Sequence, residues 1–150
     1  MLSKAQLSLY QQQGPNSSDK RVGAKHKRYY RGFVRRTYGT HTIKFYPLKL
    51  WPKIVGVNNQ TLRTWMKLEI LSANIWHQMP VMCLAEQHAL AEVVKKHHMH
   101  TKHGEITDDF KREVYDNLME VRIALDTLAR PDLDLTERHR MILSPSLQDH

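Results

Sequence analysis

Amide and guanidinium side chains cluster in the stretch GVNNQTLRTWMKLEIL, from Gly56 to Leu71. Asn and Gln can donate and accept a hydrogen bond at the edge of adenine, and Arg can donate two to guanine. Such groups on one helix favour a surface that reads base edges in the major groove, and a solvated helix face is the alternative. The residues expected to contact bases are Asn58, Asn59, Gln60, Arg63, Thr64 and Lys67.

A basic segment, KRVGAKHKRYYRGFVRRTYGTHTIK, covers residues 20–44 and interleaves cations with aromatic and β-branched residues. The turn around Gly39 predicts a β-hairpin with strands over about Tyr29–Thr37 and Thr40–Tyr46. Such a ribbon holds cations at a fixed spacing, which suits phosphates. A hairpin that covers the core, with its cations merely solvated, is the alternative. The residues expected to contact phosphates are Lys20, Arg21, Lys25, Lys27, Arg28, Arg31, Arg35, Arg36 and Lys44.

Charge is distributed unevenly along the 150 residues, whose formal net charge is +8. Residues 1–45 carry ten Lys or Arg against one acid, and residues 46–103 carry seven against three. Residues 104–150 carry six against eleven. The basic front favours a polyanionic partner. A ribosomal or membrane-surface protein could have the same basic N-terminal part.

Helical signals surround the Gly56–Leu71 stretch. A short helix is expected to begin near Leu50, with Pro52 in its first turn, and to end at the cap Gly56. Asn58 then caps a second helix over about residues 59–68. After it we expect a hairpin with strands 75–77 and 81–84 and a turn at 78–80, followed by an amphipathic helix over 84–98.

A long helix is expected from Thr107, its cap, to about Arg130, before Pro131. Its apolar residues recur at steps of 4, 4, 3, 4 and 3, which fits a core face or a dimer seam. We expect residues 131–150 to be a tail. The residues of the expected seam are Phe110, Val114, Leu118, Val121, Leu125 and Leu128.

Several classes of function find little support in the sequence. No glycine-rich phosphate loop, nucleophile elbow or HExxH motif is present, so no enzyme is expected. The single cysteine, Cys83, reads as a small core residue. No apolar run spans a membrane and no signal peptide leads the chain, so we expect an intracellular protein. The histidines read as cations at a helix end rather than a metal site, and no cofactor is expected: they are His97, His98, His100 and His103.

The Gly56–Leu71 stretch resembles the helix-turn-helix of MerR-type winged-helix proteins, whose pattern is Gly-Val-Ser-x-x-Thr-Leu-Arg-x-Trp-Glu-x-x-Gly-Leu-Leu. The resemblance covers about residues 48–114 and includes a wing hairpin followed by a helix. It implies that Arg63 and Thr64 face DNA, and that Leu62 and Trp65 face the core. The matching positions are Gly56, Val57, Thr61, Leu62, Arg63, Trp65 and Leu71.

The chain departs from that pattern in three places. Pro52 replaces a small helical residue, and Glu69 replaces the glycine before the leucine pair. The wing, IWHQMPVMC, has no Arg or Lys, so the basic segment is expected to grip phosphates in its place. No cysteine-bearing sensor domain follows, so no small-molecule effector is expected. Similar lone domains occur in phage excisionases and in the small, DNA-recognising subunits of phage terminases.

Together these features predict a mainly α fold with a small β component: a winged helix-turn-helix preceded by a basic hairpin and followed by a long C-terminal helix. We expect a disordered arm over 1–19, a DNA-binding domain over 20–103, a helical dimerisation segment over 104–130 and a tail over 131–150.

The expected function is sequence-specific binding of double-stranded DNA by a homodimer or higher oligomer. The role would be transcriptional regulation, in the cytoplasm of a bacterial or phage-infected cell and in association with the nucleoid. DNA packaging or excisionase-type recombination is the alternative. A non-catalytic RNA- or assembly-binding module is a further one.

Overall fold

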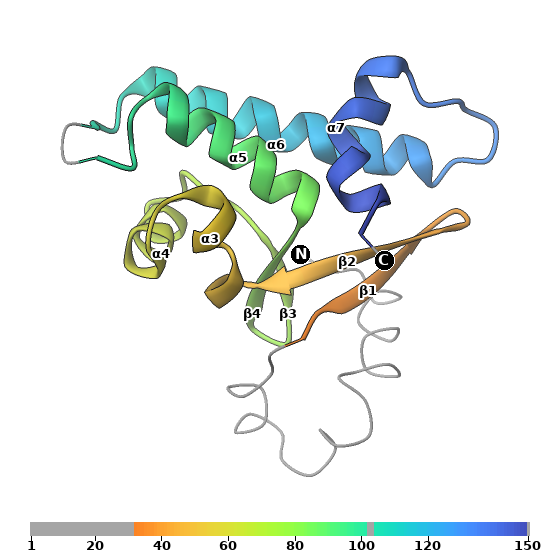
Figure 1. The fold of residues 1–150 in the computed structure, drawn as a ribbon, viewed down its shortest axis with the longest axis horizontal. Helices are drawn as coiled ribbons and strands as arrows, with labels where there is room; N and C mark the ends of the chain where they lie inside the picture. The colour runs from red at the N-terminus through yellow and green to blue at the C-terminus, as the bar shows by residue number, and fades with distance from the viewer. Residues whose placement is uncertain (1–31, 102–103, 150) are drawn as a thin grey trace, which may run out of the picture.

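A computed structural model describes residues 32–101 and 104–149 of the chain, in which helices and an antiparallel sheet form a mixed fold (Figure 1). The expected arm over 1–19 lies outside these residues. Within them, no helix is both long and apolar enough to cross a bilayer. The elements in order are β1 (Val34–Tyr38), β2 (His41–Pro47), the 3-10 helix η2 (Leu48–Leu50), α3 (Pro52–Val55), α4 (Asn59–Lys67), β3 (Asn74–Trp76), β4 (Met79–Cys83), α5 (Leu84–Lys96), α6 (Asp108–Leu128) and α7 (Glu137–Leu147).

The expected basic hairpin is present as β1 and β2, which pair antiparallel. Gly39 forms the turn with a φ of 65°, and a Cβ there would stand 2.9 Å from the carbonyl oxygen of Leu128. Glycine is therefore required both by the backbone and by the close approach of α6. The start of the predicted first strand, Tyr29–Arg31, lies outside the described residues, and β2 begins at His41 rather than Thr40.

The second hairpin, β3 and β4, is also present, but its turn is His77–Gln78 rather than Gln78–Pro80. Both turn residues have positive φ, 46° and 68°, as tight two-residue hairpin turns require. Pro80 lies inside β4, just beyond the pairing with β2 that begins at Val81, so its missing N–H costs little there.

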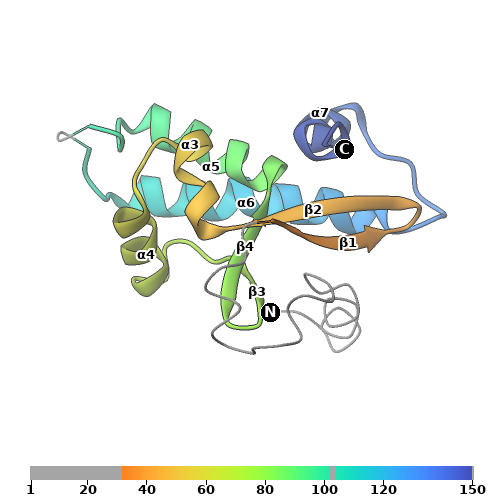
Figure 2. The same cartoon turned by 60° about the horizontal axis from the view of Figure 1, so that its bottom comes forward.

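The two hairpins form one sheet in the order β1-β2-β4-β3, because β2 pairs with β4. This joint was not predicted, since it connects strands that are separated in the chain by α3 and α4. Figures 1 and 2 show α5, α6 and α7 on one side of the sheet, with α6 running along the length of the molecule.

The apolar stripe of α6 is a core face of this chain, so the seam predicted on it is wrong. Its residues from Phe110 to Leu125 are at most 3% exposed, and Leu128 packs against the same core. The first half of α6 packs with α3, α4 and α5, and the second half packs with the sheet and α7. A heptad-like apolar stripe has the same sequence pattern in a core face and in a dimer seam, and here residues of the same chain pack against it.

Residues 131–150 are not a tail, because they contain α7. Thr136 caps this helix by accepting a hydrogen bond from the backbone N–H of His139 at 3.1 Å. Leu143 is fully buried, and the Ser146 hydroxyl accepts a hydrogen bond from Ala85 N–H at the start of α5. The segments expected over 104–130 and 131–150 therefore belong to the same packed body as the rest.

Two carboxylates fasten α6 to its neighbours and should make stability depend on acidity. Lys96 and His97 hold the pKa of Glu113 below its ordinary 4.5, and Arg138 does the same for Glu120. Such groups stabilise the fold above the ordinary carboxyl pKa, and the contribution is lost as pH falls through their lowered values. We expect urea midpoints to fall on acidification from about pH 6 to pH 3. The fall should be smaller in Glu113→Gln and Glu120→Gln, and an unchanged slope in both variants would contradict the assignment.

Candidate nucleic-acid interface

The pair of helices α3 and α4 is joined by a short, well-capped turn. Pro52 occupies the first turn of α3, as predicted, although α3 begins at Pro52 rather than near Leu50. Gly56 ends α3 with a φ of 91°, and the Asn58 side-chain oxygen accepts a hydrogen bond from Thr61 N–H at 2.8 Å. The predicted caps are confirmed, and they fix where α4 begins.

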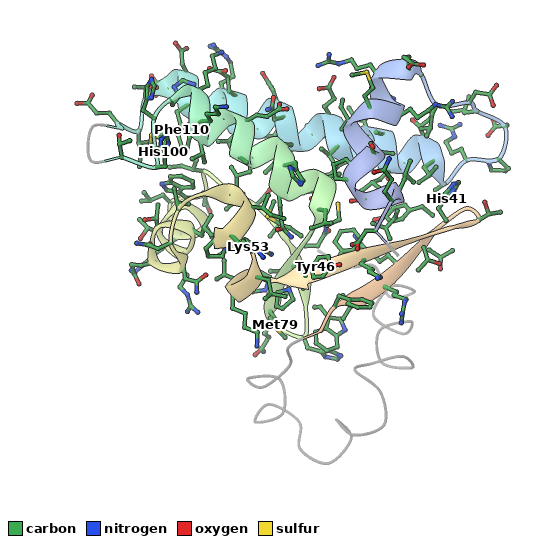
Figure 3. The ribbon with its side chains drawn as sticks, viewed as in Figure 1. His41, Tyr46, Lys53, Met79, His100 and Phe110 are labelled. Carbon is green, nitrogen blue, oxygen red and sulfur yellow. The ribbon has the colours of Figure 1, made fainter. Side chains whose placement is uncertain are left out.

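Buried side chains hold α4 against the body. Leu62 is fully buried and Trp65 is 2% exposed, which confirms that these two residues face the core. The Trp65 ring packs edge-on against Phe110 at the start of α6, with 5.1 Å between ring centroids (Figure 3 labels Phe110). The direction of α4 is therefore set by α6 as well as by α3.

The opposite face of α4 is open to solvent. Gln60, Arg63, Thr64 and Lys67 are all exposed, and their spacing of 3, 1 and 3 residues places them on one side of the helix. Thr64 donates its hydroxyl to the carbonyl oxygen of Gln60 at 2.9 Å. Within the described residues, Arg63 and Lys67 form no ion pair, so both cations are available to a ligand.

The two asparagines at the start of α4 are not presented as base readers. The oxygen of Asn58 is occupied by the cap, and the side-chain oxygen of Asn59 is buried without a hydrogen-bond partner in the described part of the chain. A bidentate contact with adenine needs both the oxygen and the nitrogen of the amide. Neither amide oxygen is free for that contact, so the structure does not support the prediction that Asn58 and Asn59 read bases.

The hairpin β3–β4 projects from the same side of the helical layer as α4 (Figures 1 and 2). Its strands and turn contain no Arg or Lys. At the turn, His77 is half-buried and its ring lies edge-on to Trp76, with 4.7 Å between centroids. This hairpin therefore offers shape rather than positive charge to a ligand.

Of the three predicted phosphate contacts in the described part of the basic segment, only Arg35 is exposed. Arg36 is 5% exposed and donates to the Tyr38 hydroxyl at 3.1 Å, so its prediction as a phosphate contact is wrong. It faces the core side of β1 with Val34 and Tyr38, and burial raises the pKa of Tyr38 to about 12. Because side chains alternate between the two faces of a strand, Arg36 lies on the buried face of β1 together with Val34 and Tyr38.

Arg35 and Lys44 are paired across the two strands next to Phe33; Arg35 is exposed, whereas the Lys44 side chain is only 13% exposed. The Arg35 guanidinium carbon lies 4.8 Å from the Phe33 ring centroid, and the Lys44 ammonium lies 4.6 Å from it. Lys44 is also 3.9 Å from Asp149, which accepts a hydrogen bond from Tyr46. Phe33, Tyr46 and Asp149 were missed by the sequence reasoning. The other predicted phosphate contacts lie outside the described residues: Lys20, Arg21, Lys25, Lys27, Arg28 and Arg31.

A buried ion pair fixes the segment between α4 and β3. Glu86 is fully buried; one carboxylate oxygen accepts from Cys83 N–H at 3.1 Å and the other from Arg122 at 3.2 Å. Arg122 also donates to the hydroxyl and carbonyl oxygens of Ser72, at 3.1 and 2.6 Å. The guanidinium of α6 thus joins the start of α5 to the chain that leaves α4.

The histidines contribute packing at the end of α5. His97 is 2.8 Å from Glu113 and lies edge-on to Phe110. Over residues 32–101 and 104–149, no three His, Cys, Asp or Glu side chains are placed to hold a metal. His103 lies outside that range, and the Cys83 thiol is buried, which raises its pKa.

No protein-family model, curated protein or solved structure matches this chain.

The end of α4 carries a strained residue, and relieving the strain should stabilise the protein. Glu69 is exposed and has a φ of 62°, a conformation that costs a residue with a Cβ about 1 kcal/mol. We expect Glu69→Gly to raise the unfolding free energy by about 0.5–1 kcal/mol in urea denaturation. Glu69→Ala removes the same charge and keeps the Cβ. A glycine variant no more stable than the alanine variant would show that the backbone is not strained.

Proposed function

We propose that this protein binds double-stranded DNA sequence-specifically, through a winged helix-turn-helix made of α3, α4 and the β3–β4 hairpin. In this proposal α4 enters the major groove, as the second helix of such a unit does. The MerR-type resemblance of the Gly56–Leu71 stretch supports the same assignment. The protein is proposed to act as a transcriptional regulator.

The observation that carries the proposal is the division of α4 into two faces. Leu62 and Trp65 are buried, while Gln60, Arg63 and Lys67 are exposed on the side away from the core. An amide and a guanidinium on a helix fixed by its neighbours are groups that suit adenine and guanine edges. Thr64 and Lys67 suit a base edge or a nearby phosphate.

Phosphate contacts are assigned to cations around this unit. Lys53 on α3 is exposed (Figure 3), and so is Arg35 on the β1–β2 hairpin, whereas Lys44 is mostly buried beside Asp149. The cations of residues 20–31 are assigned to phosphate contacts from the sequence alone. Phosphate contacts position the protein without specifying sequence, and their loss should reduce the salt dependence of binding.

Selection from random DNA duplexes tests the proposal directly. We expect enrichment of a defined motif, and binding of that motif to weaken linearly in log salt with a slope that counts the phosphates neutralised. Selected duplexes bound no better than random ones, over several salt concentrations, would contradict sequence-specific reading. That outcome would favour a non-catalytic module that binds RNA or an assembly.

A promoter that carries the selected motif tests the regulatory role. A change in transcription when the protein is expressed would support it, and loss of that change in Arg63→Ala would connect it to α4. Unchanged transcription with intact specific binding would favour the DNA-packaging or recombination role.

A further inference from the structure

The face of α6 that points away from the core carries an apolar line. Tyr115 is 61% exposed and Ile123 is 49% exposed, with the half-buried Met119 between them. Because each is four positions after the one before it, the three residues follow one another along the same side of the helix. Leu68, which ends α4, is 57% exposed and lines a shallow pocket of about 140 Å³ together with Tyr115. Grouped apolar side chains at a surface are typical of an interaction site.

The charges along this face are arranged about Met119 in a way that matches a second copy of the same helix. On this face, the residues three, four, seven and eleven positions to either side of Met119 form either an apolar pair or a pair of opposite charge. Two antiparallel copies related by a two-fold axis at Met119 would bring each such pair together. The pairs are Tyr115 with Ile123, Asp116 with Arg122, Arg112 with Asp126, and Asp108 with Arg130.

Arg112 and Asp126 are the charged pair most available for such a contact. Among the described residues, Arg112 pairs with Asp109 alone, at 2.9 Å, and the side chains of Arg112 and Asp109 are each more than 60% exposed. An exposed pair of this kind is worth little and can be exchanged. Arg122, by contrast, is engaged by Glu86 and Ser72, so its pairing with Asp116 contributes less.

We propose that this protein forms a two-fold symmetric dimer in which α6 packs antiparallel against α6 of a second copy, centred on Met119. The face used is opposite to the stripe that the sequence suggested as a seam. The occupant is a second copy because the surface is complementary to itself, a property that an unrelated partner would not require.

This dimer would set the spacing between the two copies of α4, and that part of the inference rests on the proposed function. Trp65 of α4 packs beside Phe110, nine residues from Met119, or about 13 Å along the helix. The two copies of α4 would then be offset by about 27 Å along the axis of α6, with a further separation across the helix pair because Phe110 lies on the face of α6 opposite the interface.

Light scattering without DNA tests the dimer. The wild type should approach twice its chain mass of 17.7 kDa as its concentration rises, and Ile123→Asp should stay at the single-chain mass. Met141→Asp, which changes a 68% exposed apolar residue on α7, is the matched control and should dimerise normally. A wild type that stays monomeric into the millimolar range would overturn the proposal. So would a Met141→Asp variant impaired as much as Ile123→Asp.

A charge exchange tests the register. Arg112→Asp should weaken dimerisation at least tenfold, since it places the introduced aspartate of each copy opposite Asp126 of the other, at two symmetric positions. Adding Asp126→Arg should restore the affinity to within about threefold of the wild type. The two residues lie about 21 Å apart along one helix, so they cannot compensate each other within a chain. A double variant no better than the single one would overturn this register.

The outcomes separate the dimer from the DNA-binding proposal. Dimerisation is measured without DNA, and a monomeric Ile123→Asp variant that still binds one selected half-site would leave the α4 assignment intact. A dimer that binds no selected motif would leave the α6 interface intact and remove the proposed function.

Discussion

Arg63→Ala is expected to lower the affinity for a selected DNA motif by roughly 5- to 150-fold, with little loss on random duplexes. The expectation follows from the about 1–3 kcal/mol that a bidentate base contact contributes to discrimination. Arg63 is exposed, and no described residue pairs with it, so its removal should not disturb the fold. Titrations of selected and random duplexes at matched salt give the ratio directly, and thermal unfolding verifies that stability is unchanged.

Arg140→Ala is the matched control for this experiment. Arg140 is exposed on α7, where it donates to the carbonyl oxygen of Leu135 at 3.3 Å, so its replacement removes the same charge far along the chain from α4. Equal losses in the two variants would mean that Arg63 acts only as a positive charge. A preference for the motif that survives Arg63→Ala would remove this residue from base reading.

Arg122→Ala is expected to destabilise the protein by about 3–5 kcal/mol, a large share of the roughly 5–15 kcal/mol that holds a typical domain folded. Its removal leaves the fully buried Glu86 carboxylate with the Cys83 N–H and without its cation. It also frees the two oxygens of Ser72 that hold the chain between α4 and β3. The melting temperature should fall by about 10 °C in calorimetry.

Two further variants isolate the buried charge as the cause. Adding Glu86→Gln to Arg122→Ala keeps the acceptor for Cys83 and removes the uncompensated charge, so the double variant should be more stable than the single one. Arg138→Ala breaks a comparable fork to Glu120, but one whose arginine is 72% exposed and screened by solvent, and should destabilise the protein much less. If Arg122→Ala cost no more than Arg138→Ala, the buried pair would not be important for stability.

The predictions that held are those whose signals are local. Gly56, Asn58 and Thr107 end or begin helices for reasons contained in a few neighbouring residues, and the turn at Gly39 joins two strands that are adjacent in the chain. Leu62 and Trp65 follow from the period of a single helix. Local features of this kind are therefore enough to predict the α3–α4 unit and the existence of both hairpins.

The predictions that failed depend on what lies across the fold. The orientation of Arg36 depends on which face of β1 meets the core. The apolar stripe of α6 has the same sequence pattern whether it packs in the core of its own chain or against a second chain. The helix α7 contains Pro145 and few apolar residues, so its local signal is weak. It is held by the hydrogen bond from Ala85 of α5 to the Ser146 hydroxyl and by the burial of Leu143 in the core, contacts that no local sequence pattern predicts.

The position of Cys83 gives the molecule a built-in reporter of its own opening. It is the only thiol of the chain, is fully buried, and pairs with Phe45 at the joint between the two hairpins. A thiol reagent can reach it only when the core around that joint opens, so the rate of labelling measures how often this part of the fold opens. Because the chain from Pro47 to Val81 closes on that joint, slow labelling would mean that α3 and α4 remain fastened at both ends on the same timescale.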